Sequence, residues 1–290
     1  MSSAAIKTID PPHPSPKKPR FVLPRGACDA HCHVFGPAAR FPYAANRRYT
    51  PPDAPAEKLS ALHRHLGVSR AVLVQASVHG ADNSAMLDAI SRDPANLRGV
   101  AMVDAAISDA QLEALHEGGV RAVRYNFVRH LGGAPDAAAV QRMARRIAPL
   151  GWHLVLHLDA EDLVEHEGFL RALELPFVID HMGRVVAGEG LAQEPVKRLL
   201  GLLRNERAWV KVSGADRVST TLGDFADALP FAAALVAAAP DRVLWGTDWP
   251  HPNVRVMPDD GALVDLIPRF APDEALRELL LVNNPTRLYW

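Results

Sequence analysis

The chain has 290 residues, of which 48% are hydrophobic and 22% are charged, and its formal net charge is −1. This composition is typical of a globular protein with a substantial core, and it excludes disorder for most of the chain. With no basic stripe to bind nucleic acid and no apolar run of the roughly 18 residues that a membrane span needs, we expect neither nucleic acid nor a membrane as a partner.

The first 24 residues are predicted to form an extended, Pro-rich arm. They contain six prolines, which break helices because proline lacks a backbone N–H and clashes with the preceding turn. Residues 25–290 are predicted to form one domain, because α/β barrels of this length fold as single units. The sequence leaves open whether the protein is a monomer or a homo-oligomer.

After the arm, short β-branched runs alternate with longer Ala/Leu-rich stretches of helical period. Strands are predicted at 27–34, 70–75, 97–103, 120–127, 152–158, 177–181, 209–213 and 242–248. Helices are predicted at about 56–66, 84–92, 108–117, 137–150, 160–173, 194–203, 224–238, 259–269 and 273–281. Eight strand–helix repeats predict an α/β fold of the (β/α)8 TIM-barrel type, with a doubly wound open sheet as the alternative.

Ionisable side chains stand where four of these strands end. His31 and His33 are two residues apart, so both imidazoles point to one face of the first strand. The other three strand ends carry His157, then Asp180 and His181, and finally Asp248. In this fold the active site lies at the carboxyl ends of the strands. Such a set suits a divalent metal with an open water position, and it equally suits metal-free activation of water by a carboxylate.

Positive side chains follow the same strand ends and predict an anionic substrate. They are Arg124, Arg184, Lys211 and Arg217. Arginine binds planar carboxylates through two parallel hydrogen bonds. The alternative is that these groups pair with local acids such as Asp180 or Asp216. Ser77, after the second strand, is a further candidate hydrogen-bond donor to the same ligand.

Several segments resemble the amidohydrolase-2 family of the amidohydrolase superfamily. They are residues 29–37 (DAHCHVFGP), 74–80 (VQASVHG), 179–184 (IDHMGR), 245–252 (WGTDWPHP) and 284–289 (NPTRLY). Within the family the sequence is most similar to the 2-pyrone-4,6-dicarboxylate lactonases, from about residue 25 to the C-terminus. The resemblance implies an amidohydrolase-type TIM barrel and a hydrolase of aromatic-compound degradation. Separately, the two cysteines offer no disulfide framework, which suits a reducing compartment, so we expect a cytoplasmic protein.

The resemblance also implies roles for the site residues in opening a small anionic lactone. Asp248 would take the proton from water, and His31, His33 and His181 would polarise the carbonyl and stabilise its oxyanion. The substrate-binding residues would be Arg124, Arg184, Arg217, Ser77, His130 and His157.

Two positions depart from that subgroup, which has Arg where this chain has His130 and Tyr where it has His157. The first change removes a permanent cation from the carboxylate site. The second completes a metal site for zinc or manganese formed by His31, His33, His157 and Asp248, whereas the pyrone-dicarboxylate pattern implies no metal. The alternatives are therefore a metal-dependent hydrolase of muconolactones or sugar-acid lactones, a decarboxylase of the same family, and a binding protein that has lost catalysis.

Overall fold

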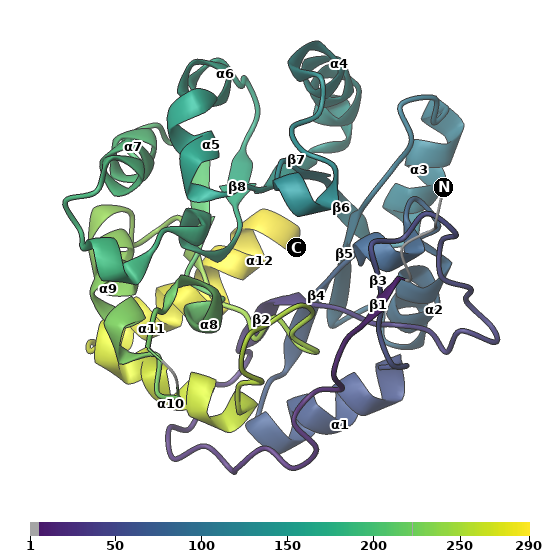
Figure 1. The fold of residues 1–290 in the computed structure, drawn as a ribbon. Coiled ribbons are helices and arrows are strands. Elements are labelled where there is room, and N and C mark those ends of the chain that lie inside the picture. The colour runs from purple at the N-terminus through teal and green to yellow at the C-terminus, as the bar shows by residue number, and fades with distance from the viewer. Residues whose placement is uncertain (1–5, 222) are drawn as a thin grey trace.

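The strands form the predicted barrel. A computed structural model describes residues 6–221 and 223–290, in which eight parallel strands lie in the order β10-β9-β8-β7-β6-β5-β4-β2 and helices surround them (Figure 1). The strands are β2 (Cys28–Cys32), β4 (Arg70–Val74), β5 (Leu97–Ala101), β6 (Val120–Asn126), β7 (His153–His157), β8 (Phe177–Ile179), β9 (Ala208–Lys211) and β10 (Val243–Leu244). Most of their residues are buried on both faces, which explains the nearly continuous apolar runs in the sequence.

The chain after β10 closes the barrel against β2. The backbone N–H of Ala30 donates to the carbonyl of Trp245 at 2.9 Å, and that of Asp248 donates to the carbonyl of His31 at 2.8 Å. A Cβ on Gly246 would lie 2.5 Å from the His31 nitrogen, so only glycine permits this approach. The regular strand is therefore shorter than the predicted 242–248, because from Gly246 onward the chain turns toward β2.

The helices are α1 (Ala56–Leu66), α2 (Ser84–Arg92), α3 (Asp109–Glu117), α4 (Ala137–Ile147), α5 (Ala160–Glu165), α6 (Glu167–Arg171), α7 (Glu194–Leu202), α8 (Ala215–Val218), α9 (Leu229–Ala238), α10 (Asp260–Phe270), α11 (Glu274–Glu278) and α12 (Asn284–Tyr289). Two predicted helices differ from the structure. The stretch 160–173 forms two short helices, and α9 begins at Leu229 because Pro230 favours the first turn of a helix. No helix in the described ranges is long and apolar enough to cross a membrane.

Apolar side chains form one core between strands and helices and a second inside the barrel. Tyr289 of α12 belongs to the inner core, and Figure 1 shows α12 near the centre of the view. The indole N–H of Trp290 donates to the carbonyl of Ala95, just before β5 begins. The C-terminal helix therefore covers the amino ends of the strands and leaves the carboxyl ends for the polar residues.

The N-terminal arm is attached at two places. The short strand β1 (Lys7–Thr8) pairs in parallel with β3 (Tyr49–Thr50). Further along, the Asp265 carboxylate of α10 accepts the backbone N–H groups of Arg20 at 2.7 Å and Phe21 at 3.0 Å. The arm thus runs along the outside of the barrel from β3 to α10.

Candidate active site

The carboxyl ends of the strands bring the predicted residues around one small cavity of about 30 Å³. Of the residues given a catalytic or substrate-binding role, all except His31 line it, namely His33, Ser77, Arg124, His130, His157, His181, Arg184, Arg217 and Asp248. Asp180 and Lys211, which were also predicted at the strand ends, do not line it. His31 is fully buried, and its ring lies 5.0 Å from that of His33 and 4.5 Å from that of His181.

The Asp248 carboxylate lies at the centre of three imidazoles. Its Oδ1 is 3.2 Å from Nε2 of His33, 3.5 Å from Nε2 of His31 and 3.8 Å from Nε2 of His181. Its Oδ2 accepts from Nε of Arg217 at 2.7 Å. Burial by itself would raise the pKa of Asp248, but the charge of Arg217 outweighs it and holds this pKa well below its usual value. Asp248 is therefore ionised and able to accept a proton.

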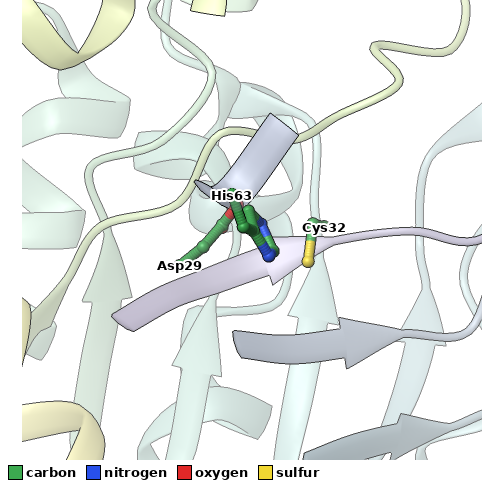
Figure 2. A group of neighbouring side chains, drawn as sticks. All are labelled: Asp29, Cys32 and His63. Carbon is green, nitrogen blue, oxygen red and sulfur yellow. The ribbon is translucent and has the colours of Figure 1, made fainter. Parts of the chain in front are cut away.

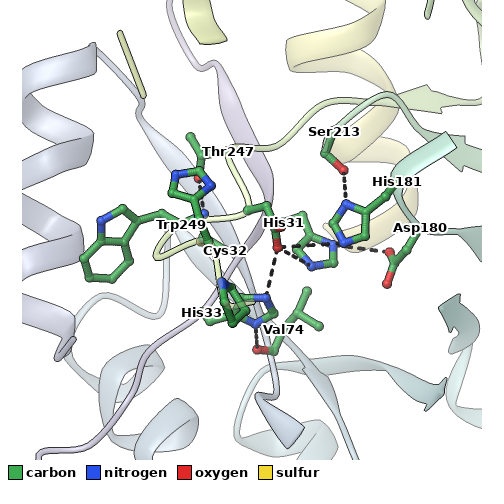
Figure 3. A network of polar contacts seen from close by, with 12 residues as sticks. His31, Cys32, His33, Val74, Asp180, His181, Ser213, Thr247 and Trp249 are labelled. Carbon is green, nitrogen blue, oxygen red and sulfur yellow. Dashed lines mark hydrogen bonds and ion pairs between the residues drawn. The ribbon is translucent and has the colours of Figure 1, made fainter. Parts of the chain in front are cut away.

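Each imidazole is oriented through its other nitrogen (Figure 3). Nδ1 of His33 lies 2.8 Å from the carbonyl of Val74, which accepts its N–H, and Nδ1 of His181 lies 3.0 Å from Oγ of Ser213. Burial lowers the pKa of His181 well below its usual value, and burial with the nearby charge of Lys211 lowers that of His31 to about 4. His31 and His181 are neutral at physiological pH and serve as hydrogen-bonding groups rather than cations.

The three arginines of the rim each contact an acid. Arg124 donates to Oδ2 of Asp180 at 3.1 Å, Arg184 to Asp159 at 2.8 Å, and Arg217 to Asp248. These contacts agree with the alternative prediction that the arginines pair with nearby acidic side chains. All three side chains nevertheless line the cavity, so they also present positive charge to whatever enters it.

Among the predicted residues that line the cavity, His181, Arg184 and Asp248 have a strained backbone with positive φ. His181 has φ of 50° and Asp248 has φ of 66°, in the left-handed region that residues with a Cβ seldom occupy. Such positions cost about 1–3 kcal/mol each and cluster at functional sites. Here the strained backbone turns these side chains toward the same cavity.

The predicted metal ligands come together only in part. Ligand atoms of His31, His33 and Asp248 lie within 4.8 Å of one another. Their separations of 3.2 and 3.5 Å fit a tetrahedral zinc ion, whose ligand atoms are roughly 3.3 Å apart. His157 does not join this group. Its Nδ1 contacts Oδ1 of Asn126 at 3.0 Å, its ring lies 5.6 Å from that of His181, and its buried Nε2 has no hydrogen-bond partner among the described residues.

A second group of metal-ligand types, Asp29, Cys32 and His63, lies where α1 packs against β2 (Figure 2). Both Asp29 oxygens are already used. Oδ2 accepts from Thr247 Oγ1 at 2.6 Å and lies 3.1 Å from His63 Nε2, while Oδ1 accepts the backbone N–H groups of His31 and Thr247. This cluster joins β2, α1 and the segment after β10, and it serves a structural role.

Sequence reasoning missed Tyr49 and misplaced Lys211. Tyr49 lines the cavity from β3, a short strand outside the barrel, and burial raises its pKa to about 12. The sequence around Tyr49 shows no helical or strand periodicity. Only the pairing of the N-terminal arm with β3 could have indicated that Tyr49 reaches the cavity. Lys211 was expected on the rim, but it is fully buried beneath His31 because it still belongs to β9.

A sequence model of the amidohydrolase family matches residues 28–290. The chain is 49% identical to a 2-pyrone-4,6-dicarboxylate hydrolase of Comamonas testosteroni, covering 95% of this chain and 94% of that protein. It is 44% identical to a 4-sulfomuconolactone hydrolase of Rhizobium radiobacter, covering 93% and 91%. A structure from Acinetobacter baumannii, assigned as a 2-pyrone-4,6-dicarboxylic acid hydrolase and solved with citric acid bound, is 28% identical with a TM-score of 0.81, covering 91% of this chain and 99% of that one.

Proposed function

The chain belongs to the amidohydrolase family, and from this premise we propose that it is a lactone hydrolase acting on a small ring that carries carboxylate groups, of the 2-pyrone-4,6-dicarboxylate type. One observation carries the proposal. An ionised carboxylate, Asp248, lies within 3.8 Å of three imidazole nitrogens in a cavity lined by three arginines.

The geometry supports a direct attack of water on the ring ester. Asp248 accepts a proton from water as its oxygen bonds to the carbonyl carbon, and imidazole N–H groups stabilise the oxyanion that forms. The carbon–oxygen bond of the ring then breaks, and the leaving oxygen takes up the proton. The products are an enol or alcohol and a carboxylic acid, which releases the second proton of the water to solvent and becomes a carboxylate.

The preference for an anionic ring is supported by charge and by the relatives. Arg124, Arg184 and Arg217 all line the cavity, and guanidinium groups bind carboxylates in a planar, two-bonded geometry. Two relatives are named for hydrolysis of anionic lactones, and the Acinetobacter baumannii protein holds citric acid, which is a polycarboxylate.

Replacing Asp248 by Asn tests the proposal. With 2-pyrone-4,6-dicarboxylate as substrate, followed by loss of the ring absorbance, we expect kcat to fall by about 10²–10⁴-fold, because the general base is lost. The Asp104→Asn variant, at an exposed position, is the matched control and should retain full activity. Hydrolysis by the wild type of neutral lactones alone, or an unimpaired Asp248→Asn variant, would overturn the proposal.

A metal-dependent hydrolase of sulfomuconolactone type is the second candidate. It is favoured by the spacing of His31, His33 and Asp248, which would hold the ion, and by the name of the Rhizobium radiobacter relative. Such an ion would polarise the carbonyl or lower the pKa of bound water. If this candidate is right, protein purified without chelator contains zinc or manganese, and 4-sulfomuconolactone hydrolysis is lost on chelation and restored by the metal. Activity indifferent to chelator would reject it.

We also propose the cytoplasm as the place of action. Both cysteines, Cys28 and Cys32, are free and buried, which supports a reducing compartment.

A further inference from the structure

We propose that Lys211 is a positioning residue that keeps the ring proton of His31 on Nε2. The Nε2–H of His31 is then available as a hydrogen-bond donor toward Asp248, and the ring is withheld from metal coordination. The inference rests on the proposed function for the use of that proton, but the location of the proton can be measured without any substrate.

Three fully buried polar side chains, Lys211, His31 and Asp180, contact one another close to Asp248. Nζ of Lys211 lies 3.0 Å from Nδ1 of His31 and 3.1 Å from Oδ1 of Asp180, and His31 Nδ1 lies 3.2 Å from the same oxygen. The Lys211–His31 contact has hydrogen-bond geometry, whereas Asp180 Oδ1 accepts no hydrogen bond from the described residues. The other oxygen of Asp180 accepts from Nε and Nη2 of Arg124.

The chemistry of these groups decides where the proton lies. Burial lowers the pKa of Lys211, but its ion pair with Asp180 at 3.1 Å opposes this shift and favours the ammonium form. An ammonium has three donors and no acceptor, so a nitrogen 3.0 Å from it offers a lone pair. Nδ1 of His31 is then unprotonated, and the single proton of the neutral ring is on Nε2. The other tautomer would point an N–H at the ammonium, and a doubly protonated ring would place a second cation beside it without water to screen the two charges.

His31 and His33 consequently have opposite proton patterns. Nδ1 of His33 faces the carbonyl of Val74, which can only accept, so its proton is on Nδ1. A metal-binding histidine normally shows that second pattern, with its outer N–H given to a carbonyl or carboxylate. Asp180 would be the natural acceptor for His31, but the ammonium of Lys211 is in hydrogen-bond contact with Nδ1 instead.

This arrangement favours the metal-free lactonase over the metal-dependent one. The Nε2–H of His31 points toward Oδ1 of Asp248, 3.5 Å away, beside the cavity where the oxyanion would form. Nε2 has no other hydrogen-bond partner among the described residues, so it is ready to donate. Coordination of a metal at this nitrogen would require Lys211 to move away or lose its proton.

The test combines nuclear magnetic resonance with metal titration. In protein labelled with ¹⁵N-histidine and assigned with a His31→Gln variant, we expect wild-type His31 to be protonated on Nε2. In Lys211→Met, which removes the donor and keeps an apolar chain of similar length, His31 should shift its proton to Nδ1 and donate to Asp180. Calorimetric titration with Zn²⁺ alone should then show stoichiometric binding by the variant and much weaker binding by the wild type.

Lys197→Met, at an exposed position on α7, is the matched control and should behave as the wild type in both measurements. A wild-type His31 protonated on Nδ1, or tight zinc binding by the wild type through His31, would overturn the proposal. The wild-type spectrum decides the matter even if Lys211→Met fails to fold. If the wild type hydrolysed none of the lactones assayed, the proposed function would be rejected, but the measured position of the His31 proton would still stand.

Discussion

At the scale of single residues, the site is a set of buried ionisable groups whose states are set by their neighbours. Asp248 is ionised although burial opposes this, because Arg217 contacts its Oδ2. His157, in contrast, is surrounded by groups that disfavour its charge, since burial and then Arg124 lower its pKa well below the usual value. The same barrel end therefore holds a permanent base and neutral imidazoles close together.

Replacing Arg217 by Met should move the acid limb of the pH profile. Asp248 works as a base only when ionised, and loss of Arg217 leaves burial to raise its pKa. Activity is then lost at a higher pH as the solution is acidified, which a profile of kcat against pH measures. Arg129→Met, at an exposed position in the same loop region as His130, is the control. An unchanged acid limb in Arg217→Met would show that Arg217 does not set the charge of Asp248.

At the scale of elements, the strands position the site and the connections complete it. β7 delivers His157 at its last residue, whereas the stretch after β8 leaves the sheet at Asp180 and places His181 by a strained turn. The strand predictions therefore located these residues correctly in the chain. The turns that aim the side chains were not predictable, because they depend on left-handed backbone conformations that no residue type here signals.

Asp265 of α10 fixes the N-terminal arm to the outside of the barrel. This carboxylate accepts two backbone N–H groups of the arm and contacts Nζ of Lys17 at 2.9 Å. Asp265→Ala should lower the free energy of unfolding by about 1–3 kcal/mol, since two hydrogen bonds from the arm to a charged acceptor are lost. Urea unfolding measures this, and Asp104→Ala, exposed on the surface, should change it little. Because Asp265 does not line the cavity, kcat should be unchanged; a fall in kcat would show that the arm supports the site.

At the scale of the whole molecule, the barrel is completed by contacts between its first and last strands. The connection uses backbone hydrogen bonds and the side chain of Asp29, which joins Thr247 to β2. Asp248 and His251 follow directly after this connection. The closure of the barrel and the position of Asp248 therefore depend on the same contacts.

Thr247→Val tests this closure with a side chain of nearly the same shape. It removes the hydroxyl that donates to Asp29 Oδ2 at 2.6 Å and accepts from the backbone N–H of Trp249 at 3.0 Å. We expect the free energy of unfolding to fall by about 1.5–3 kcal/mol, because the acceptor is a buried charge. Thr8→Val on exposed β1 is the control in the same urea titration. An unaltered stability would mean that the backbone hydrogen bonds suffice.

The sequence by itself determined the eight strands and the barrel and indicated candidate site residues at the strand ends, because burial on both faces of a strand and the residues at its end depend on short stretches of sequence. Only the tertiary structure decided the pairings. It set Arg217 against Asp248, left His157 outside the group of His31, His33 and Asp248, and placed Lys211 against His31 across 180 residues of chain. Hydrogen bonds and charges act over a few ångströms in space, so contacts between residues distant in sequence leave no local pattern from which to predict them.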